Sequence, residues 1–358
     1  MSANQNPKVE IHSNGSVQSK IKGKNRGSHS SAQHITFIDL FAGIGGIHQA
    51  FHAAGAECVF VSEKDKYARQ TYIRNFIRIA PELFKISPDE EFGNKTEALY
   101  GRVAKAIEGK HTPRFNTDIT DLTKLVKPDI PNFNILTAGF PCQPFSNVGL
   151  RKGMEEARGT LFYDILNILK MKKEEGNQPQ AFFLENVLGI LNHKSQDKLT
   201  IKVIESNLKN LGYSFNTYVV KASDFGLPQH RPRVFMIGFL NPDHADRFKP
   251  PLQKKLKPGA LEKILGGTTD REIGYTLRVG GRGSGIGDRR NWDTYIVDGQ
   301  PFKIGPEEGL RLQGFPASFR FPDGLSEAQK MKQLGNSVAI PAVKAYAQEM
   351  IRLLRGEK

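Results

Sequence analysis

The stretch that decides the fold is ITFIDLFAGIGG, residues 35–46. Its first half, Ile35–Phe41, is rich in β-branched and aromatic residues, which favours a buried strand. Glycines crowd the second half, Ala42–Gly46, and an apolar helical pattern follows over Ile47–Ala54. A strand that passes through a glycine turn into a helix indicates the start of an α/β unit.

The same alternation continues along the chain. Helical apolar faces are predicted at 161–169, 203–211 and 339–354. Strands that alternate with helices predict a Rossmann-like α/β fold, in which a mostly parallel sheet is covered on both faces. Ligands of such sheets bind at the carboxyl ends of the strands. The further apolar runs of strand length are Cys58–Val61, Asn134–Ala138, Ala181–Leu184, Tyr218–Val220 and Val234–Phe239.

Composition divides the chain into four parts. Residues 1–34 lack periodicity and are rich in Ser, Asn, Gly and Lys, which predicts a disordered basic tail. Residues 35–240 form the main domain, and 306–358 return to complete it with a C-terminal helix. Between them, 241–305 is rich in Gly, Pro, Lys and Arg and predicts a second, smaller, loop-rich domain. The polar stretch 75–117 is interpreted as a surface insertion.

The charge balance indicates a polyanionic partner. Lys plus Arg number 51 and Asp plus Glu 37, a net charge of +14. The first 30 residues hold five basic residues and one acid, so they carry +4 and the remainder carries +10. A basic surface of that size is typical of nucleic-acid binding, although a merely basic soluble protein is the alternative.

Cysteine content and hydropathy indicate the cellular compartment. Cys58 and Cys142 are the two cysteines, and no Cys/His cluster suggests zinc, so no metal is expected. No apolar run reaches the roughly 20 residues that span a bilayer, and no secretory signal is present. These features predict an intracellular, cytoplasmic protein with no membrane partner.

The glycine turn predicts a nucleoside cofactor. Glu63 lies 20 residues after Gly43 and closes the second strand, which suits a carboxylate that binds ribose hydroxyls. A dinucleotide is disfavoured because His48 occupies the third glycine position of GxGxxG. S-adenosylmethionine needs no phosphate cradle, and its cationic groups suit nearby acids such as Asp39. The alternative is a glycine turn without a ligand.

Three strand ends carry candidate catalytic groups. Cys142 lies between two prolines in the loop Gly139–Ser146, Glu185 ends the next strand, and Arg231 and Arg233 precede a third. A thiolate attacks carbon well, and an acid with an arginine can hold a planar base. The alternatives are a buried small hydrophobe for the cysteine, a helix cap for the glutamate and a solvated pair for the arginines.

With these residues, the chain resembles the bacterial DNA (cytosine-5) methyltransferases. Seven motifs occur in the order of that family and cover residues 35 to 354. They are Phe37–Gly46, Gly139–Ser146, Arg158–Phe162, Phe183–Val187, Gln229–Arg233, Arg311–Pro316 and Gly335–Val338.

The resemblance implies a fold, a reaction and a set of site residues. The fold would be that of the S-adenosylmethionine-dependent methyltransferases, with 241–305 as a target-recognition domain. A cytosine flipped out of duplex DNA would be attacked at C6 by Cys142, stabilised by Glu185 and oriented by Arg233 and Arg231, and methylated at C5. The implied cofactor residues are Phe41, Gly43, Gly45, Glu63, Asp118, Ile119, Pro141, Leu161 and Asn336, and the implied DNA contacts are Ser146, Arg278, Arg282, Arg289 and Arg290.

One position departs from the family pattern. Some members place an aromatic residue after the ribose-binding glutamate, where it stacks on adenine, and this chain has Lys64 there. The stacking contact is therefore not expected.

The sequence leaves two other functions open, a tRNA cytosine-5 methyltransferase and a catalytically silent DNA-binding protein. The expected partners are double-stranded DNA and a separate cognate restriction endonuclease. The chain is expected to act as a monomer and to release S-adenosylhomocysteine. The sequence does not identify the DNA site.

Overall fold

The computed structural model describes residues 33–84, 103, 114–122, 129–141, 161–195, 198–280 and 283–357. The predicted residues Cys142, Ser146 and Arg282 lie outside these ranges, as does the predicted tail up to residue 32. From Gln33 onward the described chain forms one compact unit. Of the helices in the described ranges, none combines the length and apolar character needed to cross a membrane.

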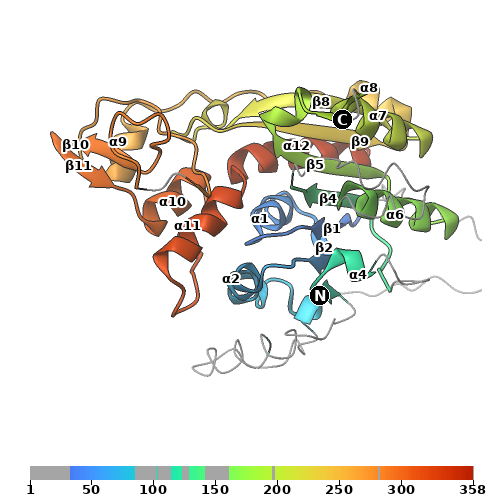
Figure 1. Cartoon of the computed structure of the whole chain (residues 1–358). Coiled ribbons are helices and arrows are strands. Elements are labelled where there is room, and N and C mark those ends of the chain that lie inside the picture. Colours follow the sequence, from blue (N-terminus) through green and yellow to red (C-terminus); the bar gives the residue numbers. More distant parts are fainter. Residues whose placement is uncertain are drawn as a thin grey trace, which may run out of the picture. The chain divides into compact units, whose positions relative to one another are not determined.

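The centre of the protein is a seven-stranded sheet with the strand order β3-β2-β1-β4-β5-β9-β8 (Figure 1). Strands β3, β2, β1, β4 and β5 run parallel, and β9 is antiparallel to both β5 and β8. The predicted mostly parallel sheet is thus confirmed, with β9 as the reversed strand. The strands are β1 (Thr36–Leu40), β2 (Glu57–Ser62), β3 (Phe115–Asn116), β4 (Ile135–Gly139), β5 (Ala181–Val187), β8 (Ser214–Lys221) and β9 (Pro232–Phe239).

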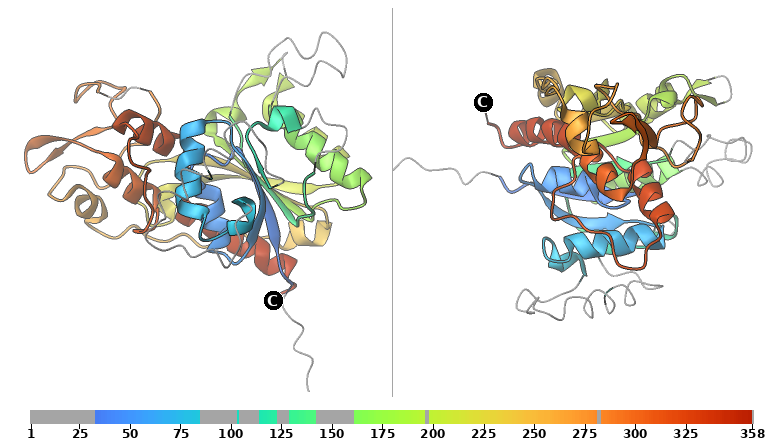
Figure 2. Two further views of the ribbon diagram at one scale, coloured as in Figure 1. Left: turned by 90° about the horizontal axis from the view of Figure 1, so that it is seen from below. Right: turned by 90° about the vertical axis from the view of Figure 1, so that its left-hand side faces the viewer.

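Helices cover both faces of this sheet, as Figure 2 shows in two further views. Buried side chains of α1, α2, α8 and α12 belong to one apolar cluster, and those of α4, α6 and α7 belong to the other. Strands β1, β2, β4, β5 and β9 are mostly buried, which explains their continuous apolar runs, whereas the edge strand β8 is largely half-exposed or exposed. The helices are α1 (Gly46–His52), α2 (Lys66–Phe76), α4 (Ile119–Leu122), α6 (Leu161–Glu174), α7 (Thr200–Asn210), α8 (Pro242–Arg247) and α12 (Ile340–Leu354).

The register brings the predicted site to one edge. Leu40 pairs with Ser62 on one side and with Ala138 on the other. Gly139 in turn pairs with Glu185. Because these strands are parallel, the residues that follow β1, β2, β4 and β5 meet at the carboxyl edge of the sheet.

Between α8 and α12, the chain forms a second group of elements. A two-stranded sheet of β10 and β11 lies in the predicted recognition region, and Gly335 and Asn336, which belong to the last of the seven motifs, form the end of α11. The domain boundaries at 240 and 305 stay predictions. The elements are α9 (Ala260–Leu265), β10 (Thr294–Val297), β11 (Gln300–Lys303), α10 (Pro306–Gln313) and α11 (Glu327–Asn336).

Short elements complete the described chain. Two single-turn helices and one small pair of strands connect the parts of the main sheet. They are η3 (Leu188–Leu191), η4 (Ala222–Asp224), β6 (Lys194–Ser195) and β7 (Lys198–Leu199).

The expectation of a surface insertion over 75–117 is wrong at both of its ends. Phe76 closes α2, and the single-turn helix η1 (Pro81–Phe84) follows it. Leu83 and Phe115 are fully buried, and Phe115 belongs to the edge strand β3. The polar composition between these ends concealed the core residues that flank it.

We expect Gly45→Ala to destabilise the fold more than Gly43→Ala. A Cβ on Gly45 would lie 2.2 Å from Phe76 Cε2, and the backbone φ there is +83°. Gly43 has a φ of +57°, but a Cβ on it would meet no atom within 4 Å. Urea unfolding should show losses of about 3 kcal/mol for Gly45→Ala and about 1 kcal/mol for Gly43→Ala. Equal losses would mean that Phe76 moves aside freely.

Candidate active site

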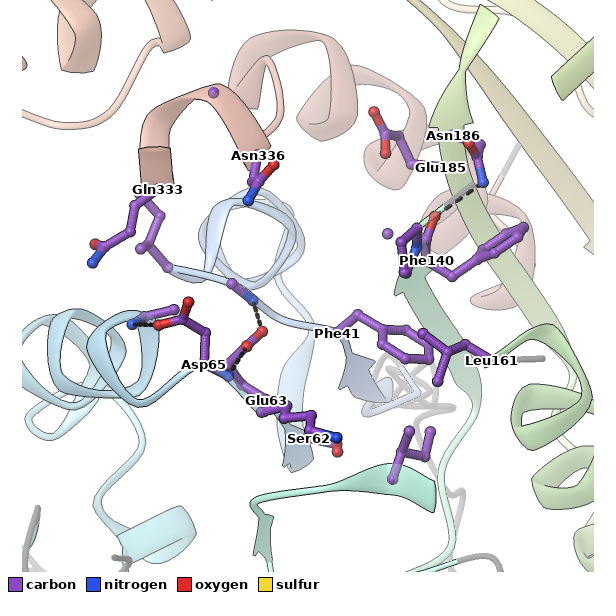
Figure 3. A pocket seen from close by; sticks show the side chains of 18 of the residues that line it. Phe41, Ser62, Glu63, Asp65, Phe140, Leu161, Glu185, Asn186, Gln333 and Asn336 are labelled. Carbon is purple, nitrogen blue, oxygen red and sulfur yellow. Dashed lines mark hydrogen bonds between the residues drawn. The ribbon is translucent and has the colours of Figure 1, made fainter. Parts of the chain in front are cut away.

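A cavity of about 790 Å³ lies at the carboxyl edge of the sheet. It gathers eight of the nine predicted cofactor residues, all except Gly45, and three of the four predicted catalytic residues. In Figure 3, Glu63 and Asp65 lie on one side of the cavity and Glu185 and Asn186 on the other. The predicted residues that line it are Phe41, Gly43, Glu63, Asp118, Ile119, Pro141, Leu161, Asn336, Glu185, Arg231 and Arg233.

The turn after β1 forms the floor of one half of the cavity. Phe41 has a φ of +56°, a left-handed conformation that costs about 1–2 kcal/mol in a residue with a side chain. Strain of this kind is concentrated at functional sites, and the Phe41 side chain lines the cavity. Gly43 leaves open space above the backbone, whereas Gly45 is the N-cap of α1 and packs against Phe76. Gly45 therefore shapes the turn rather than the cavity wall.

Glu63 ties this turn to the end of β2. Its Oε2 accepts a hydrogen bond from Gly43 N at 2.7 Å, and its Oε1 accepts one from Asp65 N at 2.6 Å. Burial raises the pKa of Glu63, and these two backbone donors partly oppose that shift. Asp65 in turn caps α2 by accepting from Tyr67 N and Ala68 N. The sequence therefore places a fixed hydrogen-bond acceptor at the cavity wall.

The other end of this half is partly apolar and partly acidic. Ile119 is buried, and Phe41 and Leu161 pack against the same apolar cluster, so together they offer a slot for a flat ring. Asp118 stands beside this slot and accepts from Thr120 N at 3.0 Å and Thr120 Oγ1 at 2.8 Å. Burial raises the pKa of Asp118, but hydrogen bonds from Lys64 and Thr120 outweigh it and lower the pKa overall.

These residues suit a nucleoside that carries positive charge. Three carboxylates, Glu63, Asp65 and Asp118, line the cavity and disfavour a pyrophosphate. They favour hydroxyl, amino and sulfonium groups, which S-adenosylmethionine has. The open space above Gly43 allows a ligand to approach the backbone closely.

Glu185 and Arg233 form the polar pair of the other half. Glu185 Oε1 lies 3.0 Å from Arg233 Nε, and the two side chains are only 11% and 13% exposed. Burial raises the pKa of Glu185, and the charges of Arg233 and Arg231 oppose that shift. The pair comes together because β5 and β9 are antiparallel, with Val187 opposite Arg233.

Asn186 positions the loop that leads to Cys142. Its Nδ2 donates to Phe140 O at 3.0 Å, and its Oδ1 accepts from Val187 N at 2.8 Å. Pro141 lines the cavity, and Cys142 is the next residue, outside the described ranges. Sequence reasoning did not assign Asn186 a role, although it stands beside Glu185 in a predicted motif.

Arg231 connects separate segments of the chain. Its guanidinium is buried and donates to Leu277 O at 2.9 Å and Gly335 O at 3.0 Å, and also to Ser337 O. These carbonyls belong to the predicted recognition region and to the end of α11, next to Asn336. These contacts hold backbone segments together, and the predicted role of Arg231 in orienting a base stays a prediction.

The predicted DNA contacts within the described ranges are exposed. Arg278, Arg289 and Arg290 all lie on the surface. Arg290 is engaged by Asp288, with Nη2 2.7 Å from Oδ2. Nearby, the guanidinium carbon of Arg271 lies 4.1 Å from the centre of the Tyr275 ring.

Sequence reasoning missed a link between α2 and α11 at the cavity. Lys332 Nζ lies 3.1 Å from Asp65 Oδ2, and Thr71 Oγ1 donates to Gln333 Oε1 at 2.8 Å. Lys332, Gln333 and Asp65 all line the cavity. These contacts join residues more than 260 positions apart, and no local sequence pattern predicts them.

Solved structures with the same architecture are methyltransferases. A Dnmt2 methyltransferase from S. pombe has a TM-score of 0.61 at 19% identity, with 90% of this chain and 99% of that chain covered. A putative DNA modification methyltransferase encoded within an E. coli prophage has a TM-score of 0.57 at 20% identity, covering 89% and 99%. At these identities the likeness shows the fold, which is the predicted methyltransferase fold.

Sequence comparison narrows the class. The profile of the family described as C-5 cytosine-specific DNA methylase matches residues 35–101, 103–278 and 271–352. Type II methyltransferase M.NlaX of Neisseria lactamica is 38% identical over 346 residues, covering 87% of this chain and 95% of the relative. Type II methyltransferase M.HhaI of Haemophilus parahaemolyticus is 32% identical over 351 residues, covering 87% and 93%.

The chain belongs to the C-5 cytosine-specific DNA methylase family. It is a DNA (cytosine-5)-methyltransferase, and its family uses S-adenosylmethionine as the methyl donor. The predicted family, fold class and activity are thus confirmed.

Breaking the Glu185–Arg233 pair should destabilise the protein. Arg233→Met would leave a buried carboxylate without its partner, which costs about 3 kcal/mol in comparable pairs. Urea unfolding should show this loss, and adding Glu185→Gln to the same chain should recover part of it because the uncompensated charge is gone. A double variant no more stable than Arg233→Met would contradict the assigned pairing.

Proposed function

We propose that this chain methylates C5 of a cytosine flipped out of a specific duplex DNA sequence, with the described cavity holding both the cofactor and the base. One observation carries the proposal: a single cavity reaches from Glu63, which is hydrogen-bonded to the glycine turn, to Glu185 and Arg233. A methyl donor and a target ring held in one cavity can meet without diffusing through solvent.

The cofactor half would be filled as follows. Glu63 accepts from the ribose hydroxyls, and Asp118 accepts from the adenine amino group. Phe41, Ile119 and Leu161 enclose the purine ring, while Gly43, Pro141 and Asn336 border the remaining wall. When bound, S-adenosylmethionine supplies an electrophilic methyl group on a sulfonium, and S-adenosylhomocysteine remains after transfer.

The nucleophile would be Cys142. The other cysteine, Cys58, is buried in β2, and burial raises the pKa of its thiol well above the usual value, so it is unsuited to attack. Pro141 lies in the cavity wall, where Asn186 fixes the preceding carbonyl. Cys142 directly follows Pro141 in the sequence, and we propose that it acts on a base held in the half of the cavity that contains Glu185.

The proposed reaction begins at Cys142. The Cys142 thiolate forms a bond to C6 of cytosine, and the C5–C6 double-bond electrons become available at C5. Glu185 contacts N3 and the amino group, and Arg233 holds Glu185 in place and balances the charge. C5 takes the methyl group, loses its proton to a base, and the S–C6 bond breaks to release Cys142.

The DNA would be read by 241–305. Exposed arginines there, including Arg278, Arg289 and Arg290, suit phosphates and guanine edges. Ser146 and Arg282 are proposed as further contacts. Because the similar relatives are named type II methyltransferases, a separate restriction endonuclease is the proposed partner system. We also propose a monomeric, cytoplasmic enzyme, in keeping with an intracellular DNA substrate.

A tRNA substrate is the alternative that the sequence left open. Bisulfite sequencing of DNA from cells that express the chain distinguishes the two. We expect protected cytosines within one short duplex sequence. Unprotected DNA together with methyl transfer to tRNA in vitro would overturn the DNA assignment.

Cys142→Ser should abolish methyl transfer while DNA binding changes by only a few fold. A serine hydroxyl provides no accessible anion near neutral pH. The measurements are transfer of labelled methyl groups to unmethylated DNA and a gel-shift titration. Cys58→Ser serves as the matched control and should retain transfer. Turnover of the Cys142→Ser protein above about 1% of wild type would exclude the thiolate as nucleophile.

Glu63→Ala should weaken cofactor binding by about 10- to 150-fold, because hydrogen bonds to a charged group are lost. Calorimetry with S-adenosylhomocysteine measures the change. Since burial raises the pKa of Glu63, the affinity of the wild-type protein should fall as pH decreases through that raised value, and the variant should not follow. An unchanged affinity would contradict the ribose assignment.

Exchange of 241–305 for the counterpart of an enzyme with a different target should transfer the new DNA specificity. The catalytic groups lie outside that segment and serve any target sequence. Bisulfite sequencing would report the methylated site. An active chimera that still methylates the original sequence would place recognition elsewhere.

A further inference from the structure

Lys64 and Asp118 form an ion pair at the cofactor half of the cavity. Lys64 Nζ lies 2.8 Å from Asp118 Oδ2, and both residues line the cavity. The Lys64 side chain is 78% exposed, whereas that of Asp118 is 18% exposed. A cation on the solvent side therefore covers a carboxylate in the wall.

The two oxygens of Asp118 have different partners. Oδ1 accepts from the backbone and the hydroxyl of Thr120, which fixes the carboxylate after β3. Oδ2 faces the ammonium of Lys64. The hydrogen bond and charge of Asp118 raise the pKa of Lys64, so the ammonium stays protonated at neutral pH. A ligand that donates a hydrogen bond to Oδ2 must therefore share or displace it.

We propose that Lys64 sets the affinity and base selectivity of the cofactor site by competing with the purine amino group for Asp118 Oδ2. The inference rests on the proposed function, in which Asp118 accepts from adenine. Where some family members place an aromatic residue that stacks on adenine, Lys64 would act through its charge.

The size of the effect follows from the exposure of Lys64. Ion pairs with one partner in solvent are weak, so removing the ammonium should tighten cofactor binding by about two- to fivefold. Salt screens such a pair, and the advantage of the variant should therefore shrink at high ionic strength.

Lys64 should also reduce discrimination between purines. A hypoxanthine ring carries a carbonyl oxygen where adenine carries its amino group. Asp118 repels that oxygen, but the Lys64 ammonium can donate to it. Without Lys64, only the acceptor remains, and the preference for adenine should widen.

The test is calorimetry with S-adenosylhomocysteine and S-inosylhomocysteine on the full chain. Lys64→Met keeps the length of the stem and removes the charge. Lys202→Met is the matched control, because Lys202 is 68% exposed and pairs with Glu205 at 2.7 Å on α7, away from the cavity. Titrations at about 50 mM and about 500 mM salt measure the screening.

We expect Lys64→Met to bind S-adenosylhomocysteine about two- to fivefold more tightly at low salt, and to bind S-inosylhomocysteine more weakly than wild type does. Lys202→Met should match wild type with both ligands. An unchanged or weakened affinity of Lys64→Met for S-adenosylhomocysteine would overturn the inference. Absence of binding to the wild-type protein would instead contradict the proposed cofactor site itself.

Discussion

The hydrogen bonds from Gly43 and Asp65 to the Glu63 carboxylate hold the cofactor half of the site together. They join the turn after β1 to the start of α2, while the same carboxylate remains at the cavity wall. The turn itself contains Phe41 in a left-handed conformation, and such strain persists only where surrounding contacts fix it. Without Glu63, the turn that carries Phe41 and Gly43 would lose its hydrogen bond to the end of β2.

The catalytic half depends on a second set of fixed backbone contacts. Asn186 holds the Phe140 carbonyl, and Arg233 accompanies Glu185 on the neighbouring strand. Arg231 extends this set by donating to the carbonyls of Leu277, which lies within the segment proposed for recognition, and of Gly335, which precedes Asn336. The segments proposed for recognition, chemistry and cofactor binding are therefore connected through main-chain atoms, which a change of side chains in 241–305 leaves intact.

Much of the fold could be predicted from the sequence because the central strands β1, β4, β5 and β9 are mostly buried, so they appear as apolar runs. The spacing from Gly43 to Glu63 predicts a ribose-binding carboxylate, and the hydrogen bond from Gly43 N to Glu63 Oε2 is a further contact that the spacing did not predict. Sequence could not separate Gly43 from Gly45, because only the position of Phe76 shows that the second glycine serves packing. Short β3 escaped notice within a polar stretch. Charge pairs such as Asp65–Lys332 depend on distant segments that fold together.

The proposed reaction requires that the thiol of Cys142 attack a cytosine held in this cavity. The most direct measurement uses duplex DNA in which 5-fluorocytosine replaces cytosine throughout, incubated with the full chain and S-adenosylmethionine. After methyl transfer, C5 carries fluorine and no proton, so the S–C6 bond cannot be released. We expect a complex that survives denaturation, with the nucleotide on the peptide that contains Cys142. Absence of the complex, or an adduct at Cys58, would contradict it.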